Sequence, residues 1–315
     1  MEDYPKTQLE FESCFPSEEA CREYLFKLRW PEKFQCPRCS HEKSWSLGNG
    51  LFKCACCNYK TSVIAGTIFE GTHKSLTLWF RAIWWIIGQK NGASALGVQC
   101  ILGFGSYETA WSWLHKLRRA MVRSGRDRLS GTVEVDESYV GGKKSGKRGR
   151  GAAGKALVVI VAEVDGTRIG RIRLQRVPDA SAEGLEDAIQ RTVEPGSVVW
   201  TDGWNGYNSL DRLGYIHEVV REEAVVGDGL LPHCHRVASL LKRWMMGTHQ
   251  GGISHDHLDY YLDEYTFRFN RRTSRSRGKL FYRLLQQAVI TDPTPYNQLI
   301  RGVRGPKKVE HNMLG

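Results

Sequence analysis

Four cysteines constrain this chain more tightly than any other feature of its sequence. They form two Cys-x-x-Cys pairs, and the four residues are Cys36, Cys39, Cys54 and Cys57. Zn²⁺ takes four tetrahedral thiolate or imidazole ligands, which two such pairs supply. In a reducing cytoplasm this pattern indicates zinc and not disulfides. We expect a zinc ribbon over residues 31–62 with a structural Zn²⁺; Cys56, inside the second pair, is an alternative ligand.

The charge of the chain favours a polyanionic partner. The net charge is +11 at pH 7 and the pI about 9.2. Lys and Arg gain affinity for nucleic acid by releasing phosphate counterions, although solvated basic loops would give the same composition. No run of about 18 apolar residues is present, so no membrane partner is expected. Without a signal peptide, the expected location is the cytoplasm, associated with the nucleoid.

The region before residue 126 has mainly helical spacing. We expect an N-terminal helical segment over residues 1–30, and a helical domain over residues 63–125 that follows the ribbon. Two helices, 93–102 and 107–122, are joined by Gly103-Phe104-Gly105, which indicates a helix-turn-helix. The second helix carries the basic residues expected to contact DNA, Lys116, Arg118 and Arg119.

From residue 131 the pattern changes to strands. Segments 132–140, 157–164 and 169–177 are apolar or alternating, and Asp165-Gly166 supplies a hairpin turn between the last two. A helix, a short strand, a short helix and another strand follow, and then two longer helices. This order predicts an α/β domain over residues 126–290, with a tail over 291–315.

Two aspartates stand at strand positions of this domain. Asp136 lies inside an apolar strand, where a charge is costly unless it is paired or binds metal. Glu134 shares its strand face, while Glu137 points the other way. Asp202 ends a short strand and, taken alone, indicates an Asp-Gly turn. Together the two carboxylates suit Mg²⁺, which binds one or two carboxylates and substrate phosphates.

A third metal ligand is expected from a later helix, and two residues compete for this role. His235 is followed seven residues later by Lys242, two helical turns away and on the same face. Glu264 is the alternative, but Arg268 at i+4 would pair with it. His233 and His235 are equally compatible with surface positions near a helix start.

Several motifs together resemble a known group, the insertion-sequence transposases with an N-terminal zinc ribbon. The motifs are the strand around Asp136, Thr-Asp-Gly-Trp at 201–204, Ser-Leu-Leu-Lys-Arg-Trp and Gly-Thr-His-Gln-Gly within 239–252, and Tyr-Leu-Asp-Glu-Tyr-Thr-Phe-Arg-Phe-Asn-Arg-Arg at 261–272. The resemblance covers roughly residues 15–290 and implies an RNase H-like mixed-sheet core with a DDE-type metal site. Asp136 and Asp202 match its first two positions. His235 matches the third, where many members have Glu, and Lys242 is the downstream basic residue: an Asp-Asp-His-Lys variant.

The resemblance implies cleavage at the ends of an insertion element, followed by attack of the freed 3′-OH on target DNA. An imidazole nitrogen is a softer ligand than a carboxylate and suits Mn²⁺ or other transition metals better than Mg²⁺, so the expected catalytic ion is Mg²⁺ or Mn²⁺. The terminal inverted repeats and target DNA are the implied partners, bound by a homodimer or higher oligomer. The remaining expected backbone contacts are Lys143, Lys144, Lys147, Arg148, Arg150, Arg271 and Arg272.

Two other functions remain compatible with the sequence. A DNA-binding regulator or domesticated transposase that has lost catalysis would explain His235 in place of Glu. An RNase H-like nuclease would cut DNA without joining it. The first would bind DNA without metal-dependent cleavage. Inverted repeats flanking the gene would separate a transposase from both alternatives.

Overall fold

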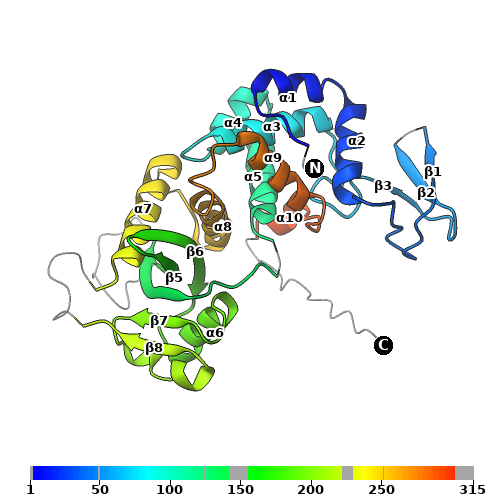
Figure 1. Cartoon of the computed structure of the whole chain (residues 1–315). Helices are drawn as coiled ribbons and strands as arrows, with labels where there is room; N and C mark the ends of the chain where they lie inside the picture. The colour runs from blue at the N-terminus through cyan, green and yellow to red at the C-terminus, as the bar shows by residue number, and fades with distance from the viewer. Residues whose placement is uncertain are drawn as a thin grey trace. The chain divides into compact units, whose positions relative to one another are not determined.

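The chain divides into two compact units in the computed structural model (Figure 1). The structure describes residues 3–48, 50–123, 125–141, 155–221, 230–250 and 252–301. The first unit comprises Met1–Arg123 and Ser274–Ile300. The second comprises Ser124–Thr273.

The first unit is helical and carries a three-stranded ribbon. Its helices are α1 (Gln8–Cys14), α2 (Glu18–Arg29), α3 (Leu76–Gly88), α4 (Ala95–Leu102), α5 (Tyr107–Met121), α9 (Arg277–Ala288) and α10 (Tyr296–Leu299). The ribbon consists of β1 (Ser44–Leu47), β2 (Leu51–Cys54) and β3 (Lys60–Ser62) in antiparallel pairs. Helix α2 begins with a side-chain N-cap, because the Ser17 hydroxyl accepts the N–H of Ala20. Ser106 caps α5 in the same way, and Gly103 ends α4 in the left-handed conformation.

The core of the first unit joins segments from both ends of the chain. Phe281 of α9 is fully buried, and its ring packs against Phe11, Phe15, Phe80 and Trp84. The sequence grouped residues up to 290 with the strands, but the structure places the segment from residue 274 to 300 in the helical unit. The reason is this aromatic cluster, which an isolated helical pattern cannot assign to one domain or another.

The second unit is built on a five-stranded mixed sheet. Its strands are β4 (Thr132–Val140), β5 (Ala156–Asp165), β6 (Arg168–Val177), β7 (Val198–Thr201) and β8 (Ile216–Val219). The spatial order is β6-β5-β4-β7-β8. The first three strands pair antiparallel, and β7 and β8 continue the sheet in parallel to β4. This topology is that of an RNase H-like core, so the expected fold class is confirmed.

Helices cover both faces of this sheet. On one face α7 (Pro232–His249) and α8 (Leu258–Phe269) pack on the side chains of Val140, Val158 and Ile160. On the other face α6 (Ala182–Thr192) and the short 3-10 turns Asn205–Tyr207 and Leu210–Leu213 pack on the alternate residues. A further 3-10 turn, His255–His257, leads into α8. Because strand side chains alternate, the face of each β4 residue follows from its position.

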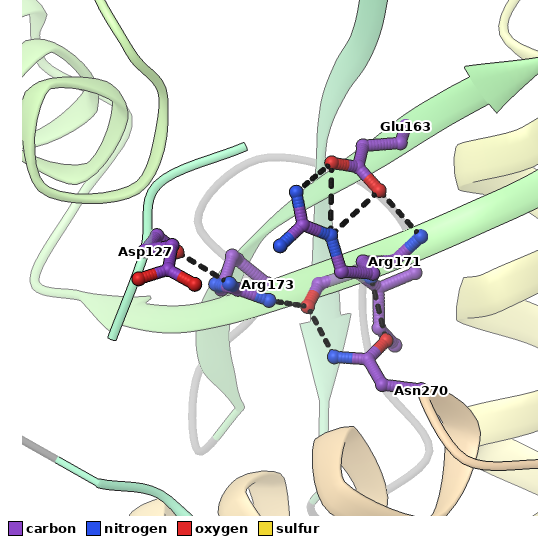
Figure 2. Close-up of polar contacts among 6 residues, drawn as sticks. Asp127, Glu163, Arg171, Arg173 and Asn270 are labelled. Atoms are coloured by element: carbon purple, nitrogen blue, oxygen red, sulfur yellow. Dashed lines mark hydrogen bonds and ion pairs between the residues drawn. The ribbon is translucent and has the colours of Figure 1, made fainter. Parts of the chain in front are cut away.

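Asn270 fastens the end of α8 to strand β6 (Figure 2). Its side-chain oxygen accepts the Ile172 N–H at 2.7 Å, and its amide donates to the Ile172 carbonyl at 3.1 Å. The buried Arg173 guanidinium donates to the same carbonyl and to that of Asp127. Beside it, Arg171 pairs with Glu163 of the neighbouring strand. The asparagine in the Phe-Asn-Arg-Arg motif therefore has a structural task in this unit.

Candidate metal centre and zinc ribbon

The sheet register brings Asp136 and Asp202 to the same level. Strands β4 and β7 are parallel neighbours, and Glu134 pairs with Trp200. Two residues further along each strand stand Asp136 and Asp202. Adjacent strands lie about 5 Å apart, so the two residues stand beside each other, and the charge of Asp202 acts on the Asp136 carboxyl. The two aspartates are far apart in the sequence, but the register of β4 and β7 places them at the same level.

Asp136 occupies a largely buried and electronegative position. Its side chain is 17% exposed, and its Oδ1 accepts the backbone N–H of Glu137 at 2.8 Å. Burial raises the pKa of Asp136 to about 6; the carboxylates of Glu137 and Asp202 raise it too, while His235 lowers it. Such a carboxylate is destabilised unless a cation is close, which is the environment of a metal ligand.

Asp202 keeps an exposed side chain while it organises its own turn. Its Oδ1 accepts the N–H of Trp204 at 3.0 Å, which is the turn expected from Asp-Gly. Gly203 has φ +78°, and a Cβ there would lie 2.6 Å from Val219. Glycine is therefore required after Asp202, and the turn and the metal-ligand interpretations of Asp202 are compatible.

His235 and Lys242 lie on the same side of the sheet as Asp136. The Nε2 atom of His235 is 3.5 Å from Oδ2 of Asp136, and the His235 side chain is 53% exposed. Burial lowers the pKa of Lys242; the charge of Lys155 also lowers it, and Asp136 opposes them. Lys155, which the sequence analysis did not single out, lines a cavity of about 490 Å³ together with Lys242. The other three expected residues, Asp202, His235 and Lys242, thus lie near enough to Asp136 to interact with its charge.

Glu264 is held by its own helix. The carboxylate is fully buried and accepts hydrogen bonds from the Arg268 guanidinium at 2.8 and 2.9 Å. This is the i+4 pair that the sequence offered as the plain alternative to metal binding. The geometry favours His235 over Glu264 as the third candidate metal ligand.

Glu134 and His233 form a contact that the sequence analysis missed. The Nδ1 atom of His233 lies 2.5 Å from Oε1 of Glu134, and both side chains are largely buried. Glu134 lies on the same strand face as Asp136, and Glu137 points the other way, where Tyr207 donates to it at 2.6 Å. The sequence contains one signal for this contact, which is its spacing. Glu134 precedes Asp136 by two residues, and His233 precedes His235 by two.

The four predicted cysteines converge in the ribbon. The ligand atoms of Cys36, Cys39, Cys54 and Cys57 lie within 4.8 Å of one another. The Cys36–Cys57 and Cys39–Cys54 sulfur pairs are 3.7 and 3.6 Å apart, as a tetrahedral thiolate site requires. Cys56 is exposed and does not belong to this group. The arrangement supports a structural Zn²⁺ bound by the four predicted residues.

The basic residues expected at DNA have different surroundings. Arg118 is 1% exposed and its guanidinium lies 3.4 Å from His115, so it is a buried residue of α5 and we withdraw it as a DNA contact. Burial also lowers the pKa of Lys116. Arg119 on the same helix is half-buried. Amphipathic packing explains the difference, because one face of α5 must enter the core.

The second basic segment is also partly engaged within the protein. The Arg272 guanidinium donates to the carbonyls of Gly170 and Ile169 and lies 4.1 Å from the Phe269 ring centroid. The Arg271 guanidinium lies over Phe267 and donates to its carbonyl. These contacts give Arg272 a structural role at the β5–β6 hairpin. The expected contacts Lys143, Lys144, Lys147, Arg148 and Arg150 lie outside the described residues.

The chain combines a zinc ribbon with an RNase H-like core, in which two aspartates stand at the same level of neighbouring strands. These features define a class of multidomain, metal-associated proteins. Comparisons with known proteins narrow the class. Residues 128–270 match the ISXO2-like transposase domain, and residues 16–60 match the transposase zinc-ribbon domain. The chain belongs to the insertion-sequence transposases with an N-terminal zinc ribbon.

One curated relative extends the similarity over most of the chain. It is an uncharacterized protein in the transposable element ISH50 of Halobacterium salinarum. The two sequences are 28% identical over 287 residues, which covers 84% of this chain and 94% of the relative. No helix in the described part of the chain is long and apolar enough to cross a membrane.

Proposed function

We propose that this transposase cuts the ends of an insertion element and joins them to target DNA, using divalent metal held by Asp136, Asp202 and His235. The observation that carries the proposal is the gathering of these residues: two aspartates at one register level, with the His235 ring 3.5 Å from Asp136. Two carboxylates and an imidazole form a donor set that suits Mn²⁺ and accepts Mg²⁺.

The residues of the site have separate roles in phosphodiester cleavage. When bound, the divalent ion lowers the pKa of the attacking water or 3′-hydroxyl and stabilises the charge of the transition state. Asp136 and Asp202 supply the fixed negative charge that retains the ion. Lys242 and Lys155 offer ammonium groups to the phosphates of the DNA strand beside the scissile bond. Glu264 remains a structural residue in this proposal.

DNA recognition is assigned to the helical unit. We propose that the ribbon and helices α4 and α5 recognise the terminal inverted repeats, with Lys116 and Arg119 as backbone contacts. Transposition needs two element ends in one complex, so we propose that the protein acts as a homodimer or higher oligomer on DNA. Because phosphate contacts are electrostatic, binding should weaken steeply with salt.

Cleavage of a labelled element-end fragment tests the proposal. Asp136→Asn and Asp202→Asn should each lower cleavage and strand transfer by at least about 100-fold, since a charged metal ligand is lost. Asp165→Asn, a matched change in the exposed β5–β6 turn, should leave both reactions unchanged. Equal activity in all four proteins would contradict the metal centre. DNA binding without metal-dependent cleavage in the wild type would instead support a regulator.

The choice of metal tests the role of His235. His235→Ala should abolish most activity, and wild-type activity in Mn²⁺ should equal or exceed that in Mg²⁺ because imidazole favours the softer ion. His235→Glu should move the preference towards Mg²⁺. Unchanged activity in His235→Ala would remove His235 from the site and return Glu264 to consideration.

A further inference from the structure

The first turn of α7 begins without a cap of its own. Leu231 at the N-cap position has no side-chain acceptor, and Pro232 follows at the start of the helix. Leu231 is 1% exposed and Cys234 is fully buried, so water does not reach the backbone N–H of Cys234 freely. An unpaired buried N–H costs about 1–3 kcal/mol, and another acceptor is therefore required.

Glu134 of the central strand supplies that acceptor. Its Oε2 accepts the backbone N–H of Cys234 at 2.9 Å, and its Oε1 lies 2.5 Å from Nδ1 of His233. The Cys234 thiol is 3.3 Å from the Glu134 carbonyl oxygen. A carboxylate is stabilised by the positive end of a helix, which makes the buried charge of Glu134 acceptable.

This contact lies beside the metal centre and joins the same two elements. Glu134 is fixed on both sides of β4, paired with Ala162 of β5 and Trp200 of β7. Asp136 follows Glu134 by two residues, and His235 follows His233 by two. Two neighbouring contacts therefore join β4 to α7. One is between Glu134 and His233, and the other is between Asp136 and His235.

We infer that Glu134 and His233 are positioning residues, which hold the first turn of α7 so that His235 faces the metal held by Asp136. The inference rests on the proposed function. Glu134 is 1% exposed and both of its carboxylate oxygens are engaged, so it serves the site through α7 and not as a ligand. Partners that orient metal-binding residues change metal affinity or activity by about 10–100-fold when removed.

The test compares His233→Ala with His233→Asn. Alanine removes the group that contacts Glu134, whereas the asparagine amide can donate from nearly the position of Nδ1. In His233→Ala the Mn²⁺ concentration for half-maximal cleavage should rise about 10–100-fold, with an unchanged KM for DNA. His233→Asn should restore most of the wild-type value. His257→Ala, which removes a histidine bonded to Ser254 at 2.7 Å, is the matched control and should change neither quantity.

Direct Mn²⁺ binding by titration calorimetry, without DNA, separates this inference from the proposed function. Weaker Mn²⁺ binding in His233→Ala than in the wild type supports positioning even if no cleavage is found. Equal binding and an equal Mn²⁺ requirement in these two proteins would overturn the inference, while loss of cleavage in Asp136→Asn would still support the proposed function. A wild type that binds no Mn²⁺ would overturn both. Failure of His233→Asn to rescue would also overturn the role given to the hydrogen bond.

Discussion

At the scale of single residues, Asp136 links the stability of the fold to the proposed metal site. Its carboxyl is destabilised as an anion by burial and by two neighbouring carboxylates, which raises its pKa to about 6. A side chain that binds metal need not stabilise the metal-free fold. Here the ionised Asp136 carboxylate lowers the stability of the folded protein. His235 opposes that cost only in part.

Asp136→Asn should therefore stabilise the metal-free protein at pH 7. The folded state binds the Asp136 proton more tightly than the unfolded state, so the free energy of unfolding falls as the pH rises from about 4 to about 6, and the loss is complete above pH 6. We expect a gain of roughly 1 to 3 kcal/mol at pH 7, which disappears as the pH falls towards 4 and both states become protonated. Urea unfolding in EDTA at several pH values measures it; a gain that grows at low pH would contradict the assignment.

For the pair of Glu264 and Arg268 we expect the opposite effect. Loss of this ion pair should destabilise the protein, and it should affect stability alone. Arg268→Ala removes a cation from a fully buried carboxylate and should cost about 3–5 kcal/mol. Folded Glu264→Gln protein should retain most of its cleavage rate. Urea unfolding and cleavage rates per folded molecule measure the two effects, with the exposed Arg191→Ala as the control for loss of an i,i+4 ion pair. A large loss of cleavage with normal stability in Glu264→Gln would contradict the structural role.

At the scale of elements, we expect the ribbon to depend on its metal as well as on packing. Its strands have three or four residues each, which is too short for an independently stable sheet. The four cysteine sulfurs bring together the two turns, so binding energy of the ion is folding energy for the module.

Chelation should unfold the ribbon and leave the five-stranded sheet intact. We expect stoichiometric zinc release to a chromogenic chelator, with loss of amide-exchange protection in residues 36–62 and unchanged protection in β4 and β5. Cys57→Ser should lose zinc, whereas Cys56→Ser should keep it because Cys56 is exposed and outside the cluster. Protection of the ribbon that survives zinc removal would show that packing alone holds it.

At the scale of the whole molecule, the chain returns to its first unit after completing the second. Helix α9 follows the sheet unit in sequence, yet Phe281 completes the aromatic core formed by α1, α3 and the residues after α1. A deletion after residue 273 would therefore damage the helical unit and not only remove a tail.

Phe281→Ala should destabilise the helical unit selectively. Truncation of a fully buried aromatic side chain costs about 3–5 kcal/mol, whereas the exposed neighbour Lys279→Ala should stay within about 0.5 kcal/mol of the wild type. Amide exchange resolved along the chain should show faster opening in α1, α3 and α9, with β4–β6 unaffected. Uniform destabilisation of both units would contradict the division.

The sequence by itself determined what local chemistry and strand periodicity can specify. Two Cys-x-x-Cys pairs predict their zinc ligands, because four thiolates within 22 residues have few other uses. The alternation in β4 predicted which face Glu134, Asp136 and Glu137 occupy, since side chains in a strand alternate regardless of the rest of the fold.

Only the tertiary structure decided the matters that depend on which distant elements meet. It placed His235 against Asp136, buried Glu264 and Arg118, and revealed Glu134 beneath the start of α7. Helical periodicity indicates that a residue shares a face with its neighbours at i+3 and i+4, but not what that face contacts. A charged side chain becomes a ligand, a core pair or a helix cap only when packing sets its distance to other charges.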